Sequence, residues 1–101
     1  MRVIWSPLAL DRVSEAAEYI ARDNAVAAEK WVSRIFEAGE ELSGFPKRGR
    51  RVPEAGRQDI REICFGKYRI VYRVEANRIV ILTVRHLRRL LDKEELKFSG
   101  G

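Results

Sequence analysis

The sequence contains a single cysteine, Cys64, and a single histidine, His86, among its 101 residues. One cysteine cannot form an internal disulfide, which favours a reducing compartment. No group of His, Cys, Asp or Glu has the spacing of metal ligands, so we expect neither a metal site nor another cofactor. A glycine-rich phosphate loop and a nucleophile elbow are also missing from the sequence. The residues therefore offer no support for metal-dependent or nucleophilic catalysis.

Long hydrophobic runs are missing as well. No stretch approaches the length of a membrane span, and the first ten residues, MRVIWSPLAL, lack the apolar run and cleavage site of a signal peptide. We expect a soluble cytoplasmic protein that does not contact membranes. The length of 101 residues and a hydrophobic content of 46% suit one globular domain with its own core.

Acidic residues are scarce in the second half of the chain. Residues 1–45 hold 5 basic and 8 acidic side chains, whereas residues 46–91 hold 13 basic and 4 acidic ones. The last ten residues add 2 basic and 3 acidic side chains, so the net charge of +5 arises from the segment 46–91. Such a charge distribution attracts a polyanion or an acidic protein partner.

The first half of the chain has the pattern of one short strand and two helices. Residues 2–5 form a short apolar stretch, and Ser6-Pro7 then combines a helix-capping residue with a proline suited to the first helical position. Apolar residues follow at helical spacing to residue 20, and again from residue 25 to residue 42. Two helices joined by so short a connection should form an antiparallel hairpin.

The second half predicts three antiparallel strands at about residues 60–65, 68–74 and 79–86. Residues 47–59 contain Gly49, Pro53 and Gly56 among charges and predict a mobile surface loop. The expected fold is a two-layer α+β domain, β-α-α-β-β-β, whose antiparallel sheet carries the helical hairpin on one face. We assign residues 1–91 to this domain and residues 92–101 to a C-terminal tail.

The opposite face of this sheet has no predicted cover, although residues 79–84 are apolar on both faces. Unless the tail or a partner covers it, such a face forms an exposed apolar patch, which usually marks a binding site. Four arginines on the predicted strands would surround it: Arg61, Arg69, Arg73 and Arg85. Arginine binds phosphate or carboxylate through two parallel hydrogen bonds, although charges at a sheet rim also simply keep the sheet soluble.

Five segments resemble the RelE/ParE toxins of bacterial type II toxin–antitoxin systems. They are W-S-P-L-A-L-D at 5–11, Y-I-A-R-D-N-A-V-A-A at 19–28, F-P-K-R-G-R-R-V-P-E at 45–54, R-E-I-C-F-G-K-Y-R-I-V-Y-R-V at 61–74 and V-R-H-L-R-R at 84–89. The resemblance implies the same β-α-α-β-β-β fold. It also implies growth arrest by the free toxin and neutralisation by a cognate antitoxin in a hetero-oligomer. We expect that partner to place an acidic and apolar segment on the sheet face and in the helical hairpin groove.

Departures from the family favour its ParE-like branch, which inhibits DNA gyrase, over its RelE-like branch, which cuts mRNA on the ribosome. The ribonuclease members of this family carry lysines at the positions that correspond to Ile60 and Glu62 of this chain. The Glu62 carboxylate would repel a phosphodiester. A His-Tyr pair suited to proton transfer in other relatives is replaced by Leu87 and Arg88. The segment V-R-H-L-R-R resembles a His-Gly-Arg-Arg signature of ParE-like members, with Leu87 in place of the glycine.

We therefore expect a gyrase inhibitor that binds its target and is not an enzyme. The expected target contacts are Arg61, Arg69, Arg85, His86, Arg88 and Arg89, and the basic loop expected to meet a polyanion contains Lys47, Arg48, Arg50 and Arg51. In the mRNA endonuclease alternative, Arg69 and Arg89 would clamp the phosphate. A second alternative is a non-toxic member that binds an antitoxin and helps to repress its own operon. Trp5, Trp31 and Phe45 are expected in the core, and Cys64 is expected to be buried.

Overall fold

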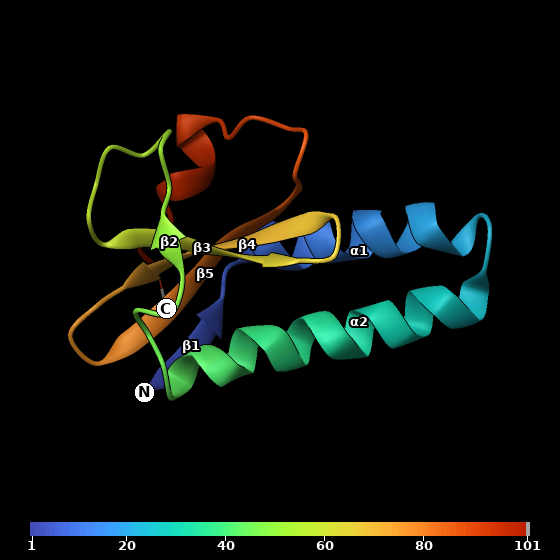
Figure 1. Cartoon of the computed structure of the whole chain (residues 1–101), viewed down its shortest axis with the longest axis horizontal. Helices are drawn as coiled ribbons and strands as arrows, with labels where there is room; N and C mark the ends of the chain where they lie inside the picture. Colours follow the sequence, from blue (N-terminus) through green and yellow to red (C-terminus); the bar gives the residue numbers. More distant parts are fainter. Residues whose placement is uncertain (101) are drawn as a thin grey trace.

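The computed structural model describes residues 1–100, which form a helical hairpin and a five-stranded sheet (Figure 1). The elements in chain order are β1 (Arg2–Trp5), α1 (Pro7–Ala21), α2 (Ala25–Glu40), the short 3₁₀ turn η1 (Glu41–Ser43), β2 (Arg50–Arg51), β3 (Ile60–Phe65), β4 (Tyr68–Val74), β5 (Arg78–His86) and η2 (Lys93–Leu96). The sheet order is β1-β5-β4-β3-β2. The predicted α+β fold with a helical hairpin is thus confirmed.

The sheet is mixed, because β1 pairs with β5 in parallel while the other neighbours are antiparallel. A parallel pair needs a long crossover connection, and here the helical hairpin and β2–β4 all lie between the two strands in the chain. The predicted antiparallel arrangement holds for β3, β4 and β5. None of the helices in residues 1–100 has the length and apolar character needed to cross a membrane.

Both helices begin where the capping residues predicted. The Ser6 hydroxyl accepts a hydrogen bond from the Ala9 N–H at 3.0 Å and donates one to the Leu82 carbonyl at 2.8 Å, so it also ties α1 to β5. The Asn24 side chain accepts from the Ala27 N–H at 3.0 Å and starts α2. The apolar stripes of the two helices pack on one sheet face in a core that includes Ala9, Val13, Ile35, Leu42, Ile70, Tyr72, Ile79 and Ile81.

The other face of the sheet is covered by the chain itself, so the expected bare apolar face is wrong. Val52, Leu91 and Leu96, with Ala55 and Phe98 beside them, form a second core cluster over Ile60, Val71, Val80 and Leu82 of the sheet. Figure 1 shows η2 and residues 52–59 on the side of the sheet away from α2. The physical reason is that β5 is apolar on both faces, and the nearby tail supplies leucines and a phenylalanine to bury them.

Residues 47–59 lie largely at the surface as expected, and β2 and buried Val52 tie them to the sheet. Two further expectations are wrong. Cys64 is exposed because it lies two residues beyond Glu62 on the same face of β3, closer to the turn at Gly66. Phe45 is 69% exposed, since the chain turns away from the sheet after η1.

Candidate functional site

Strand register places the predicted arginines of β4 and β5 on one face of the sheet. Arg69 lies directly opposite Arg85, and a register shift between Val71 and Tyr72 then leaves Arg73 opposite Val80. This face is the one covered by the C-terminal segment, which we define as residues 89–98. The arginines therefore meet the chain's own backbone and carboxylates before they meet solvent.

Arg69 is held at the centre of a buried ion-pair network. Its side chain bonds Glu54 at 2.7 Å and Glu62 at 3.0 Å, and its Nη2 also donates to the Arg89 carbonyl at 2.7 Å. Arg69 is 5% exposed and Glu62 is 1% exposed. Glu62 also accepts from Arg50 at 2.6 Å, so the carboxylate that would repel a phosphate instead links two arginines. The planar guanidinium fork suits this role because it can meet several acceptors at once.

Arg85 and Arg73 hold the C-terminal segment at two further points. The Arg85 guanidinium bonds the buried Glu95 carboxylate at 3.0 Å. The same carboxylate accepts a hydrogen bond from the Thr83 hydroxyl at 2.9 Å. Arg73 Nη2 donates to the Phe98 carbonyl at 2.5 Å. Together with the Arg69 contact to Arg89, three strand arginines fix the segment at its start, middle and end.

Two carboxylates of these networks, Glu54 and Glu95, favour their charged forms. A hydrogen bond from Arg69 is the main reason that the pKa of Glu54 falls to about 2. Burial alone would raise the pKa of Glu95, but bonds from the Asp92 N–H, Thr83 and Arg85 outweigh it and lower that pKa. Each carboxylate therefore binds a proton less readily in the folded chain than in the unfolded one.

This linkage predicts a loss of stability in acid. Because the folded pKa of Glu54 is depressed, its contribution is complete above its unfolded value of 4.5 and disappears as the pH falls to about 2. Urea denaturation at successive pH values should show the free energy of unfolding falling across that interval. The Glu54→Gln variant should be less stable at pH 7 and should show a shallower decline. An equally steep decline in both proteins would contradict the assignment.

The exposed cations lie at the end of β5 and in the turn before β4. Arg88, Arg89 and Lys67 are exposed, and their side chains have no ion pair among residues 1–100. His86 is half-buried, and its Nδ1 accepts from the Arg88 N–H at 3.1 Å. Leu87 has a negative φ and donates its N–H to the Lys67 carbonyl at 2.8 Å, so leucine causes no backbone strain here.

The remaining predicted residues lie in β3 and the basic loop. Some of them bond other residues of the chain, and others are exposed to solvent. Arg61 donates to the Gly49 carbonyl at 2.8 Å, and Arg50 is tied to Glu62. Arg48 forms a loose contact with Glu41 at 3.4 Å, while Lys47 and Arg51 are exposed. The ten predicted site residues therefore do not converge on one pocket.

The part of the chain that the structure describes contains no group of side chains arranged for metal binding, and its one histidine has no partner there for proton transfer. Residues 1–100 contain no cluster of three or more potential metal ligands. His86 contacts Tyr68 edge-on at 5.4 Å between ring centroids, and within the same residues it has no carboxylate partner. The side chains open at this end of the sheet include cations and aromatic rings.

The fold is thus a helical hairpin packed on a five-stranded sheet, with exposed cations at the end of β5. The family model for the ParE toxin of the type II toxin–antitoxin system parDE matches residues 3–91, so the chain belongs to this toxin family. It is 36% identical over 88 residues to Y4kP of Sinorhizobium fredii (strain NBRC 101917 / NGR234), whose name describes it as a toxin; this match covers 84% of the chain and 86% of Y4kP. It is 28% identical over 89 residues to toxin RelE2 of Caulobacter vibrioides, covering 88% of the chain and 98% of that protein.

Solved structures share the same fold. The chromosomal ParDE system of P. aeruginosa aligns with a TM-score of 0.71 at 20% identity, covering 85% of this chain and 95% of the other. The RelBE2 toxin–antitoxin complex of Mycobacterium tuberculosis aligns with a TM-score of 0.60 at 22% identity, covering 84% and 95%. The predicted membership of the RelE/ParE superfamily is confirmed.

Sequence reasoning missed the acidic partners of the arginines and one aromatic cluster. Glu54 and Glu95 were not assigned any role, although each is a carboxylate close in sequence to an apolar residue that proves to be buried. Trp31 packs against the first core cluster as expected, and it also contacts Tyr68 at 5.1 Å between ring centroids. No sequence pattern would have linked α2 to the start of β4.

Proposed function

We propose that this toxin inhibits DNA gyrase in the cytoplasm and does not cleave RNA. The observation that supports this function most directly is the burial of Arg69 in ion pairs with Glu54 and Glu62. An arginine that clamps a scissile phosphate must be free to reach it, whereas this one is already bonded to two carboxylates and a carbonyl. The match to the ParE family model agrees with this branch.

Exposed cations are the target contacts in this proposal. His86, Arg88 and Arg89 at the end of β5 carry the interaction, with Arg61 and the basic loop at the periphery. Arg69 and Arg85 position the C-terminal segment instead of touching the target. Arginines at the centre of an interface often carry much of its binding energy.

A supercoiling assay with purified gyrase tests the function. The protein should inhibit supercoiling and cause cleaved DNA to accumulate, and the Arg88→Ala/Arg89→Ala double variant should need about tenfold more protein for the same inhibition, equivalent to about 1.4 kcal/mol. Lys97→Ala, which removes an exposed cation paired only with Glu94, serves as the matched control. Normal supercoiling at an excess of wild-type protein would exclude gyrase as the target.

The mRNA endonuclease is the second candidate, favoured by the 28% identity to toxin RelE2. Primer extension on a translated message would reveal it as discrete cuts after induction of the protein. Absence of both activities, together with normal growth, would favour the member that only binds antitoxin and represses its operon.

The antitoxin partner needs a surface that the chain itself leaves open. The shallow groove between α1 and α2, about 500 Å³, is lined by Ala17, Ala21, Ala28 and Val32 among others. We place an amphipathic helix of the antitoxin there, because small alanines let another helix approach closely. The C-terminal segment already occupies the sheet face that we had expected the antitoxin to cover.

A further inference from the structure

One groove of the molecule combines aromatic rings with unpaired cations. It lies between the helical hairpin and the ends of β4 and β5, and it measures about 750 Å³, within the range of ligand sites in proteins. In Figure 1 the turn between β3 and β4 lies beside the helical hairpin. Six lining residues carry the argument, and they come from four elements and two turns: Tyr19, Trp31, Lys67, Tyr68, His86 and Arg88.

Three rings of this groove, those of Trp31, Tyr68 and His86, form one cluster. Tyr68 contacts Trp31 at 5.1 Å and His86 at 5.4 Å between centroids, each in an inclined arrangement. Tyr19 of α1 lines the same groove, and burial is the main cause that raises the pKa of Tyr68. Tyr19 is 66% exposed, with the Arg22 guanidinium 5.8 Å from its ring centroid.

The polar edges of these rings are left without partners. The Trp31 Nε1–H, the Tyr19 and Tyr68 hydroxyls and the His86 Nε2 have no hydrogen bond within residues 1–100, whereas the Trp5 Nε1–H donates to Glu40 at 3.2 Å. Because His86 Nδ1 accepts from the Arg88 N–H, its Nε2 carries the proton and is a donor. The groove thus offers ring surface together with free donors and acceptors.

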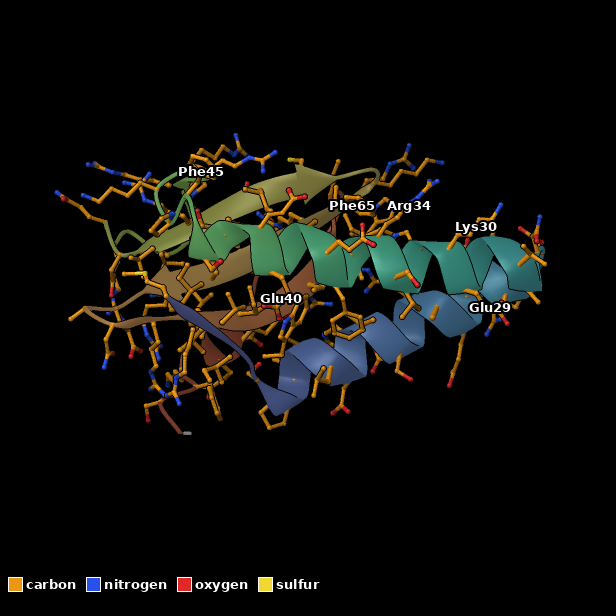
Figure 2. The ribbon with its side chains drawn as sticks, turned by 90° about the horizontal axis from the view of Figure 1, so that it is seen from below. Glu29, Lys30, Arg34, Glu40, Phe45 and Phe65 are labelled. Atoms are coloured by element: carbon orange, nitrogen blue, oxygen red, sulfur yellow. The ribbon has the colours of Figure 1, made fainter. Side chains whose placement is uncertain are left out.

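Positive charge surrounds the groove. Lys67 and Arg88 line it and have no ion pair in the described chain, while Asp23 is its one lining carboxylate. Lys30 and Arg34 lie on α2, the helix that also carries Trp31, and Figure 2 labels both along that helix. A ligand that combines planar rings, polar edges and negative charge matches the rings and the two unpaired cations of this groove.

We propose that this groove binds unpaired bases of single-stranded nucleic acid, with Lys67 and Arg88 contacting the phosphates. Bases stack on aromatic side chains irrespective of sequence, and a basic rim follows the backbone. The site is separate from the face that Arg69 occupies beneath the C-terminal segment, and it shares His86 and Arg88 with the proposed gyrase contact. The proposal adds a binding activity to the toxin, and its tests use the purified chain without gyrase.

The two tryptophan indole N–H signals of the ¹⁵N-labelled full chain provide the test. Titration with (dT)₈ and, separately, (rU)₈ should shift the Trp31 signal saturably, while the Trp5 signal serves as an internal reference, because Trp5 packs at the C-terminal end of α2 and does not line the groove. Tyr19→Ala should weaken binding at least about fivefold through lost stacking. Leu10→Ala, another exposed apolar residue of α1, is the matched control.

Salt dependence tests the phosphate contact. Lys67→Ala should reduce the slope of log K against log salt by about 0.7, the change expected for one lost contact to a single strand. Lys97→Ala should leave the slope unchanged. A shift with only one of the two oligonucleotides would identify DNA or RNA as the ligand.

Three results would overturn the proposal. The first is the absence of a Trp31 shift with either oligonucleotide at low salt. The second is an equal shift and affinity with an inorganic polyphosphate of the same charge, which would reduce the groove to a site of general attraction. The third is tighter binding of the acidic peptide Glu-Glu-Glu-Phe-Glu-Glu-Glu than of either oligonucleotide, which would make the groove a docking surface for protein.

Discussion

Replacing Arg69 with alanine should lower the free energy of unfolding by about 3–5 kcal/mol, the range measured when one partner of a buried ion pair is removed. The change would leave Glu62, which is 1% exposed, and Glu54 without their common cation. It would also release the Arg89 carbonyl at the start of the C-terminal segment. Urea denaturation monitored by circular dichroism measures the loss.

The matched control is Arg51→Ala, because Arg51 is an exposed arginine of the neighbouring sheet edge and should cost less than about 0.5 kcal/mol. Arg69→Lys should give an intermediate loss, since an ammonium group cannot reproduce the fork that meets Glu54, Glu62 and a carbonyl together. If Arg69→Ala abolished toxicity while leaving stability unchanged, the residue would be a target contact and its structural role would be refuted.

Replacing Leu96 with alanine should lower the free energy of unfolding by about 2–4 kcal/mol. Leu96 is 8% exposed and packs with Val80 and Leu82 in the second core cluster, so the shorter side chain leaves a cavity beneath η2. Leu90 belongs to the same segment but is 81% exposed, and Leu90→Ala should change stability by less than about 0.5 kcal/mol.

Guanidinium or urea melts of the two leucine variants measure the difference directly. Equal, small effects would mean that the C-terminal segment contributes little to the core in solution. Because Glu95 is anchored to Arg85 and Thr83 beside Leu96, hydrogen exchange of the η2 amides should also accelerate in Leu96→Ala and not in Leu90→Ala.

Local features of the chain predicted the helices and the central strands. Ser6-Pro7 and Asn24 are capping residues, and they satisfy backbone N–H groups whatever the rest of the chain does. The period-two alternation of side chains in KYRIVYRV, residues 67–74, likewise predicted a strand, and Tyr72 of that strand faces the helical core. These signals act over a few neighbouring residues, so the sequence alone is enough to predict the helices and strands.

The site could not be read in the same way, because its contacts join residues distant in sequence. Arg69 meets Glu54, 15 residues earlier, and the Arg89 carbonyl, 20 residues later. Whether Arg69 and Arg85 lie on the same face of the sheet depends on the register of β4 and β5, which a one-residue bulge changes. Charge composition alone therefore suggested exposed arginines where the fold buries them in pairs.

The amino-acid sequence by itself determined the element order, the helical hairpin, the positive second half and the toxin family. Only the tertiary structure decided which cations remain free. The reason is that the apolar underside of β5 is buried by the C-terminal segment together with Val52 and Ala55, and this brings Glu95 and Glu54 onto the strand arginines. The arginines are then paired and covered, so they cannot reach a target. The cations at the end of β5 lie outside that cover and stay open to a partner.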